Sequence, residues 1–138
     1  MTLSKTTELG TISVSDIIFA QIIEKSLKIP ECRDKVWAAT KKGRQIGNEQ
    51  KLNISDLAHE IDVEPSADGD SIELTFHVII RFGAGIKLIT DILTEYISET
   101  VLQKLGKKPD LIRIRIVGVK SRNIAKRNLE VVKRYGTL

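Results

Sequence analysis

Residues 72–81 read IELTFHVIIR and residues 111–119 read LIRIRIVGV. In both stretches apolar side chains recur at every second position, the pattern of a β-strand that buries one face. Between them, Gly83-Ala84-Gly85 leads into residues 86–101, where apolar side chains return every three or four positions, as on one face of a helix. The sequence therefore predicts a strand, turn, helix and strand, with the helix ending near Gly106 to Pro109.

A further strand is expected before the strand at residues 72–81. Residues 61–64 alternate in the same way, and the turn-forming residues 65–70 separate them from the strand at 72–81, which predicts a β-hairpin. Residues 55–60 suggest a short helical turn before it. The odd-numbered side chains of the strand at 72–81, among them His77 and Arg81, are expected on a face of the sheet that helices leave open.

The N-terminal part predicts a strand and a helix. Residues 1–9 are expected to be a flexible tail, residues 10–14 alternate as a short strand, and Ser15-Asp16 can cap a helix from Asp16 to about Lys28, which Pro30 ends. Between residues 31 and 57 the pattern is weak. There Val36-Trp37-Ala38 suggests a helical turn, and residues 41–48 suggest an exposed loop. Trp37 itself is interpreted either as a core residue or as an exposed anchor for a partner.

The C-terminal residues 120–138 are predicted to form a basic helix that Asn123 caps, because Ile124, Leu129, Val132 and Tyr135 have roughly helical spacing. The predicted fold class is α+β: a small β-α-β-β-α-β sheet with helices over one face, plus this helix. Residues 10–119 would form a single domain, which suits a chain of 138 residues.

Composition restricts the setting. The chain has one cysteine, Cys32, which excludes an internal disulfide and is typical of a reducing compartment. It contains neither a signal-like segment nor an apolar run of membrane-spanning length, so we expect a cytoplasmic protein. Aromatic side chains make up only 4%, which disfavours binding that depends on stacking bases or sugars on rings.

Positive charge gathers toward the C-terminus. From Lys104 onward eleven Lys and Arg residues face only Asp110 and Glu130 as acids, an arrangement that suits an acidic protein, a nucleic acid or an anionic membrane surface. Guanidinium groups on the open sheet face could converge on phosphates or carboxylates, or could simply cover the sheet. The candidate partner or anion-binding surface comprises Arg81, Arg113, Arg115, Lys120, Arg122, Lys126, Arg127, Lys133 and Arg134.

Chemistry-bearing motifs are weak. Gly83-Ala84-Gly85 is too short for a dinucleotide or phosphate loop, so a strand exit and helix entry is favoured. His59 and His77 have no neighbours at metal-ligand spacing, and His77 is interpreted as a surface histidine. We therefore assign no catalytic, cofactor-binding or metal-binding residue.

Several segments together resemble the bacterial alkaline-shock family of envelope stress response proteins. They are residues 10–15 entering a helix with Ile22-Ile23, the strand 72–81 followed by Phe82-Gly83 and Ile86, and residues 112–119 ending in Val117-Gly118-Val119. The stretch from Pro30 to Asp56 is longer and more charged than the family's usual turn.

The resemblance implies a non-enzymatic cytoplasmic protein of cell-envelope homeostasis that self-associates. It also implies recruitment to the inner face of the membrane by a protein partner, which in some members is a small membrane-anchored protein, while some relatives are associated with lipid metabolism. The alternative from the residues themselves is a nucleic-acid-binding module that uses Arg113, Arg115 and the basic C-terminal segment. An enzyme of lipid or phosphate chemistry is disfavoured, because no catalytic constellation supports it.

Overall fold

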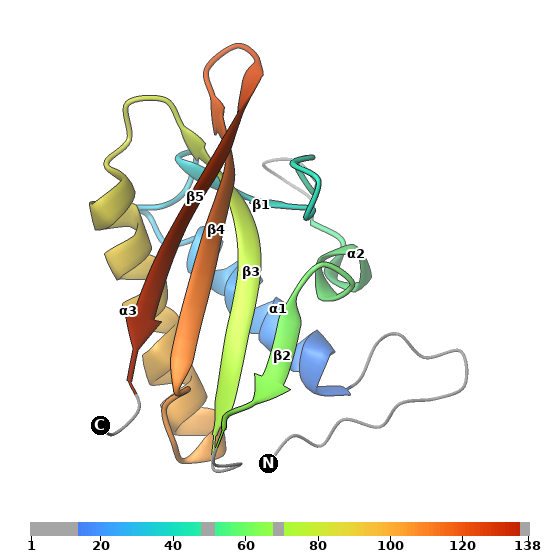
Figure 1. The fold of residues 1–138 in the computed structure, drawn as a ribbon, viewed down its shortest axis with the longest axis vertical. Coiled ribbons are helices and arrows are strands. Elements are labelled where there is room, and N and C mark those ends of the chain that lie inside the picture. Colours follow the sequence, from blue (N-terminus) through green and yellow to red (C-terminus); the bar gives the residue numbers. More distant parts are fainter. Residues whose placement is uncertain (1–13, 48–51, 68–70, 136–138) are drawn as a thin grey trace.

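The computed structural model describes residues 14–47, 52–67 and 71–135 (Figure 1). These residues form a mixed α/β fold with a five-stranded sheet and three helices. The elements, in chain order, are α1 (Val14–Leu27), β1 (Val36–Ala39), α2 (Ile54–Ala58), β2 (Asp62–Pro65), β3 (Ile72–Arg81), α3 (Ile86–Leu105), β4 (Leu111–Lys120) and β5 (Ile124–Arg134). No helix in these ranges combines the length and apolarity needed to cross a membrane.

Strand β3 lies at the centre of the sheet. On one side it pairs with β1 along its C-terminal half and with β2 along its N-terminal half, both antiparallel. On the other side it pairs with the parallel strand β4, and β5 then pairs antiparallel with β4. Because α3 connects two neighbouring parallel strands, β3, α3 and β4 form a βαβ unit, as the periodicity predicted.

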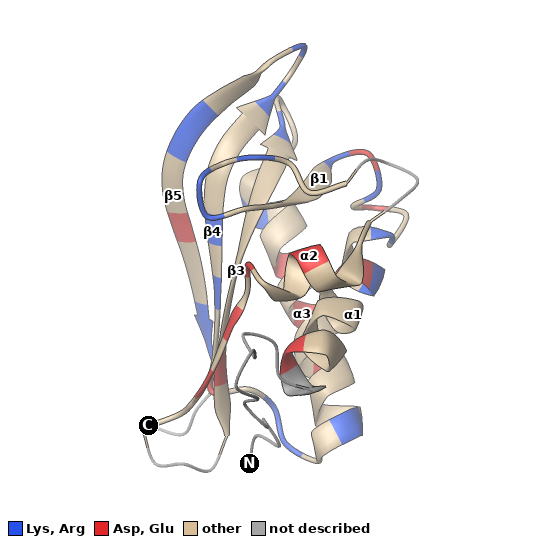
Figure 2. Ribbon diagram, turned by 90° about the vertical axis from the view of Figure 1, so that its right-hand side faces the viewer, with Lys and Arg blue, Asp and Glu red and all other residues tan. Residues whose placement is uncertain are grey.

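All three helices lie on one side of the sheet (Figure 2). The even-numbered side chains of β3, and those of β4 as far as Ile116, point toward them and are buried, Phe76 and Ile114 among them. From α3, the side chains of Ile89, Leu93, Ile97 and Val101 complete this core. We call the opposite side, which carries the odd-numbered side chains of β3, the open face.

Glycine conformations place the ends of α3. Gly83 has a φ of +87°, a left-handed value that suits glycine, and it turns the chain from β3 toward the helix. Gly85 is the N-cap residue of α3, and Gly106, with a φ of +78°, is its C-cap. The interpretation of residues 83–85 as a strand exit and helix entry is therefore confirmed.

The helical turn predicted at Val36-Trp37-Ala38 is wrong, because these residues belong to strand β1. Tertiary pairing decides the matter: Val36 lies opposite Ile80 and Trp37 opposite Ile79, so β1 satisfies hydrogen-bonding groups on the edge of β3. A four-residue segment has too little periodicity to indicate this on its own. The predicted short helix before β2 corresponds to α2, where the Asn53 side chain caps the backbone N–H of Asp56.

The predicted basic C-terminal helix is also wrong, because residues 124–134 form strand β5. A short turn at 121–123 leads back along β4, and the strand register places Val131 opposite Ile114. The spacing of Ile124, Leu129 and Val132 fits a helix loosely, but pairing with the otherwise unsatisfied edge of β4 outweighs that local preference. The predicted order of sheet elements is thus only partly met.

The predicted tail at residues 1–9, and residues 10–13 of the predicted first strand, lie outside the described residues. Val14, the last residue of that predicted strand, already belongs to α1, which therefore begins two residues before the predicted start at Asp16.

Candidate interaction surface

Arg113 and Arg115 lie side by side on the open face, and Glu130 of β5 bridges them. The Glu130 carboxylate accepts hydrogen bonds at 3.0 Å from Arg113 Nε and at 3.0 Å from Arg115 Nη1. These two candidate cations therefore converge, but on an acid of the same sheet. One negative charge offsets part of their positive charge, and the trio carries a net charge of about +1.

Arg81 does not join this pair. It lies at the C-terminal end of β3, opposite Lys120, whereas Arg115 lies opposite His77 farther down the strand. The Arg81 guanidinium donates to the backbone oxygen of Asp34 at 3.3 Å. The predicted group of three arginines is thus a pair plus a separate residue.

Lys120 contacts the loop that follows β1. Its ammonium group lies 4.6 Å from the centre of the Trp37 ring and donates to Gln45 Oε1 at 2.8 Å. At this end of the sheet the loop bends over the open face, since Gly43 approaches the Val117 carbonyl oxygen of β4. Trp37 is half-buried beneath the lysine, so it is neither a core residue nor a fully exposed anchor.

The hairpin of β4 and β5 projects beyond the rest of the described chain (Figure 1). We call its outer part, residues 120–130, the β4–β5 arm. Every residue from 121 to 130 is exposed, including the candidate cations Arg122, Lys126 and Arg127. Ile124 and Leu129, which are 38% and 44% exposed, interleave apolar surface with these cations. The arm is therefore a mixed cationic and apolar surface.

The last two candidate cations lie at the other end of β5. Lys133 reaches α3, where its ammonium group lies 2.9 Å from an Asp91 carboxylate oxygen. Hydrogen bonds from Lys87 and Lys133 hold the pKa of Asp91 below its usual value. The hydrogen bond between Lys133 and Asp91 also raises the pKa of Lys133. Lys133 thus attaches β5 to α3, while Arg134 is exposed.

His77 is buried, contrary to the prediction of a surface histidine. Only 6% of the residue is exposed, and no hydrogen-bond partner faces its Nδ1 atom. The alternation correctly placed His77 on the open face but gave no sign that β1 and the segment around Glu60 and Asp62 pack beside it. Burial lowers the pKa of His77, and the nearby cations Arg115 and Lys41 lower it further, against the opposing effects of Glu60 and Asp62.

This environment makes stability depend on pH. Because the pKa of His77 is lower in the folded chain, the unfolded chain binds a proton more readily as the pH falls through 6.5. The contribution of His77 to stability is therefore present above that pH and is lost on acidification. We expect urea unfolding of His77→Gln to show a smaller loss of stability between neutral and mildly acidic pH than the parent chain. The exposed His59 provides the matched control, and an unchanged pH dependence in His77→Gln, equal to that of His59→Gln, would contradict the assignment.

Glu130 can be tested by the substitution Glu130→Gln. It leaves two adjacent guanidinium groups without their shared acid, and because all three side chains are partly exposed we expect a loss of at most about 1 kcal/mol in the free energy of unfolding. The loss should shrink as salt screens the arginine repulsion. Glu99→Gln, which removes one exposed contact with Lys108, is the control. Urea unfolding at low and high salt measures both, and an identical salt response of the two variants would argue against the bridge.

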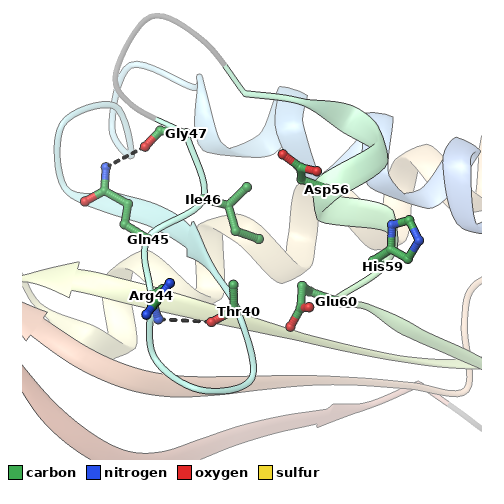
Figure 3. A pocket seen from close by; sticks show the side chains of 8 residues that line it. All are labelled: Thr40, Arg44, Gln45, Ile46, Gly47, Asp56, His59 and Glu60. Carbon is green, nitrogen blue, oxygen red and sulfur yellow. Dashed lines mark hydrogen bonds between the residues drawn. The ribbon is translucent and has the colours of Figure 1, made fainter.

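A shallow hollow lies between the loop after β1 and α2 (Figure 3). Its volume is about 340 Å³, and its polar lining includes Thr40, Arg44 and Gln45 from the loop and Asp56, His59 and Glu60 from the α2 side. The lining mixes both signs of charge and contains none of the predicted site residues. Some of the hydrogen-bonding groups in this lining already bind each other, since Thr40 Oγ1 accepts from the Arg44 backbone N–H at 3.0 Å.

The remaining reactive side chains are dispersed. Cys32 is fully buried, and burial raises the pKa of its thiol to about 11, so the nucleophilic thiolate is disfavoured. Within residues 14–47, 52–67 and 71–135, no group of three or more His, Cys, Asp or Glu side chains is placed to hold a metal ion.

In comparisons with known proteins, no family model, no curated protein and no solved structure matches the chain. The surface just described therefore has to be interpreted from its own geometry.

Sequence reasoning missed Glu130 and Gln45, two of the residues that bind candidate cations on the open face. A signal for Glu130 was present: a short turn at residues 121–123 followed by an antiparallel strand would have placed it close to Arg115. Gln45 had no such signal, because its contact with Lys120 joins residues 75 positions apart through the bend of a loop.

Proposed function

We propose that this chain is a non-enzymatic cytoplasmic protein of the envelope stress type, which acts through self-association and a protein partner at the inner face of the membrane. The resemblance to the alkaline-shock family supplies the cellular role. The segments that carry it within the described chain correspond to α1 with Ile22-Ile23, to β3, to the turn into α3, and to β4 with Gly118. All but the first belong to the βαβ unit at the centre of the sheet.

The observation that best supports a binding role is the β4–β5 arm. Its side chains project from the body with cations and apolar groups interleaved, and Ile124 and Leu129 remain accessible. A surface of this mixed kind suits a protein partner that offers acidic and apolar side chains. The arm cations near a membrane would also be attracted by anionic lipids, which would favour a peripheral position.

The proposal is tested by co-purification of the tagged chain from its native cell. Membrane and soluble fractions are kept separate, and half of each is treated with nuclease. We expect a protein partner in the membrane fraction that survives nuclease and is lost when Arg122 and Arg127 are changed to glutamine together. Recovery in the soluble fraction alone, without a protein partner under envelope stress, would overturn it.

A nucleic-acid-binding module is the second candidate. It is favoured by Arg122, Lys126 and Arg127, which lie on a projecting two-stranded arm, because a major groove admits a two-stranded β-ribbon. The bridge of Glu130 to Arg113 and Arg115 counts against the open face as the contact surface, because the acid would meet phosphates there. Binding to duplex DNA should weaken steeply with salt if this candidate is correct, and a constant that barely changes with salt would exclude it.

A further inference from the structure

The outer edge of β5 carries a long row of backbone groups that no described strand pairs. β5 is the last strand of the sheet order and spans Ile124–Arg134, whereas the opposite edge is divided between the short strands β1 and β2. The Tyr135 N–H donates inward, to the Asp110 oxygen at 2.8 Å. By the alternation of an antiparallel ladder, the N–H groups of Arg134, Val132 and Glu130 then point away from β4.

We propose that β5 pairs antiparallel with β5 of a second copy of this chain, which joins two sheets into one across a twofold axis. The β5–β5 interface is the surface through which the proposed self-association would occur, so this inference rests on the self-association part of the proposed function. Such an interface is isologous, so each residue pair occurs twice. The register that we infer centres on Asn128 and places Lys126 of one copy opposite Glu130 of the other.

Charge complementarity favours this register over one centred on Glu130. Lys126 lies opposite Gly118, and a Cβ atom on Gly118 would point toward Ile79 and Ile124 on the open face. Residues opposite each other in a ladder share a face, so Lys126 lies on the open face together with Ile124. Glu130 lies there too, because it binds Arg115. In the proposed register each Lys126 meets a Glu130, which gives two attractive cross-strand pairs. A register centred on Glu130 would instead place two acids opposite each other, which is unfavourable.

Apolar contacts agree with the same register. Ile124 of one copy would lie opposite Val132 of the other on the open face, and Ala125 opposite Val131 on the helix side. Ile124 is 38% exposed in the single chain, and this pairing would cover it. A second copy therefore satisfies the charges, the apolar side chains and the backbone groups of the edge together.

The test uses charge reversal on the full-length chain. Lys126→Glu alone and Glu130→Lys alone each place like charges opposite each other twice, so we expect sedimentation velocity to show dimer dissociation constants at least about tenfold weaker than that of the parent chain. A mixture of the two variants restores two attractive pairs. It should form a heterodimer close to the parent in affinity, which a defect in folding could not produce.

Arg127→Glu is the matched control for Lys126→Glu. It makes the same change in net charge at the neighbouring position, but on the opposite face of the strand. We expect it to dimerise nearly as the parent does. A dimer that withstands both single reversals would overturn edge pairing while leaving self-association intact. A parent chain that stays monomeric at all concentrations would overturn edge pairing together with self-association; an extended segment of another protein would then be the occupant. Recruitment by a partner is tested separately by the co-purification.

Discussion

Replacing Phe76 by alanine is expected to lower the free energy of unfolding by about 3–5 kcal/mol, the largest effect of any substitution considered for this chain. Phe76 lies on the central strand β3, points toward the helices and is 0% exposed. Its ring is the largest fully buried side chain of the core. Removing it leaves a cavity in a layer built mainly from isoleucine, leucine and valine, whose stiff β-branched side chains can collapse only in part.

Urea unfolding followed by far-UV circular dichroism measures the change. Phe82→Ala is the matched control, because Phe82 follows the same strand by one residue and is 71% exposed. We expect that control to change stability by less than about 0.5 kcal/mol. Comparable losses in the two variants would mean that the inward and outward sides of β3 had been assigned wrongly.

The second large effect is expected at Gly118, in the irregular part of the β4 ladder. A Cβ atom added there would lie 2.7 Å from Ile124 Cγ2 and 3.3 Å from Ile79 Cγ1. Because both neighbours are β-branched and Ile79 is fully buried, they cannot move aside without cost. We therefore expect Gly118→Ala to lose about 1–3 kcal/mol of unfolding free energy.

A double-mutant cycle isolates the cause. Ile124→Ala removes the Cγ2 atom that obstructs residue 118, so the loss from Gly118→Ala should be smaller in that background. Ile124→Val retains the Cγ2 atom and should give no relief. Equal losses in the alanine and valine backgrounds would show that backbone conformation, rather than the close contact, requires glycine. The contact with Ile124 gives a physical reason for glycine at this position.

Whether the candidate cations form a binding surface stays a prediction, but the position of two of them in the sheet can be compared with the structure. The alternation in residues 111–119 placed Arg113 and Arg115 together on the open face, and the structure confirms that placement. The cations of residues 120–134 were found by composition but assigned to a helix. Their presentation on a projecting strand changes the surface from a helical stripe to an arm with a pairing edge.

What the sequence determined by itself is the βαβ unit and its boundaries. Strand and helix periodicities are local properties, and glycine at positions 83 and 106 supplies the left-handed backbone that the chain needs there. The hairpin of β2 and β3 followed from the same local signals, since its strands are close in sequence and separated by turn-forming residues.

Only the tertiary structure decided the two outer strands and the environments that they create. β1 and β5 are strands because β3 and β4 offer edges whose backbone groups need partners, a requirement that local propensity does not record. The burial of His77 and the bridge from Glu130 to two arginines follow from those pairings. The alternation of side chains along a strand reveals which face of the sheet a residue occupies. Which residues surround it there depends on contacts between segments far apart in the chain.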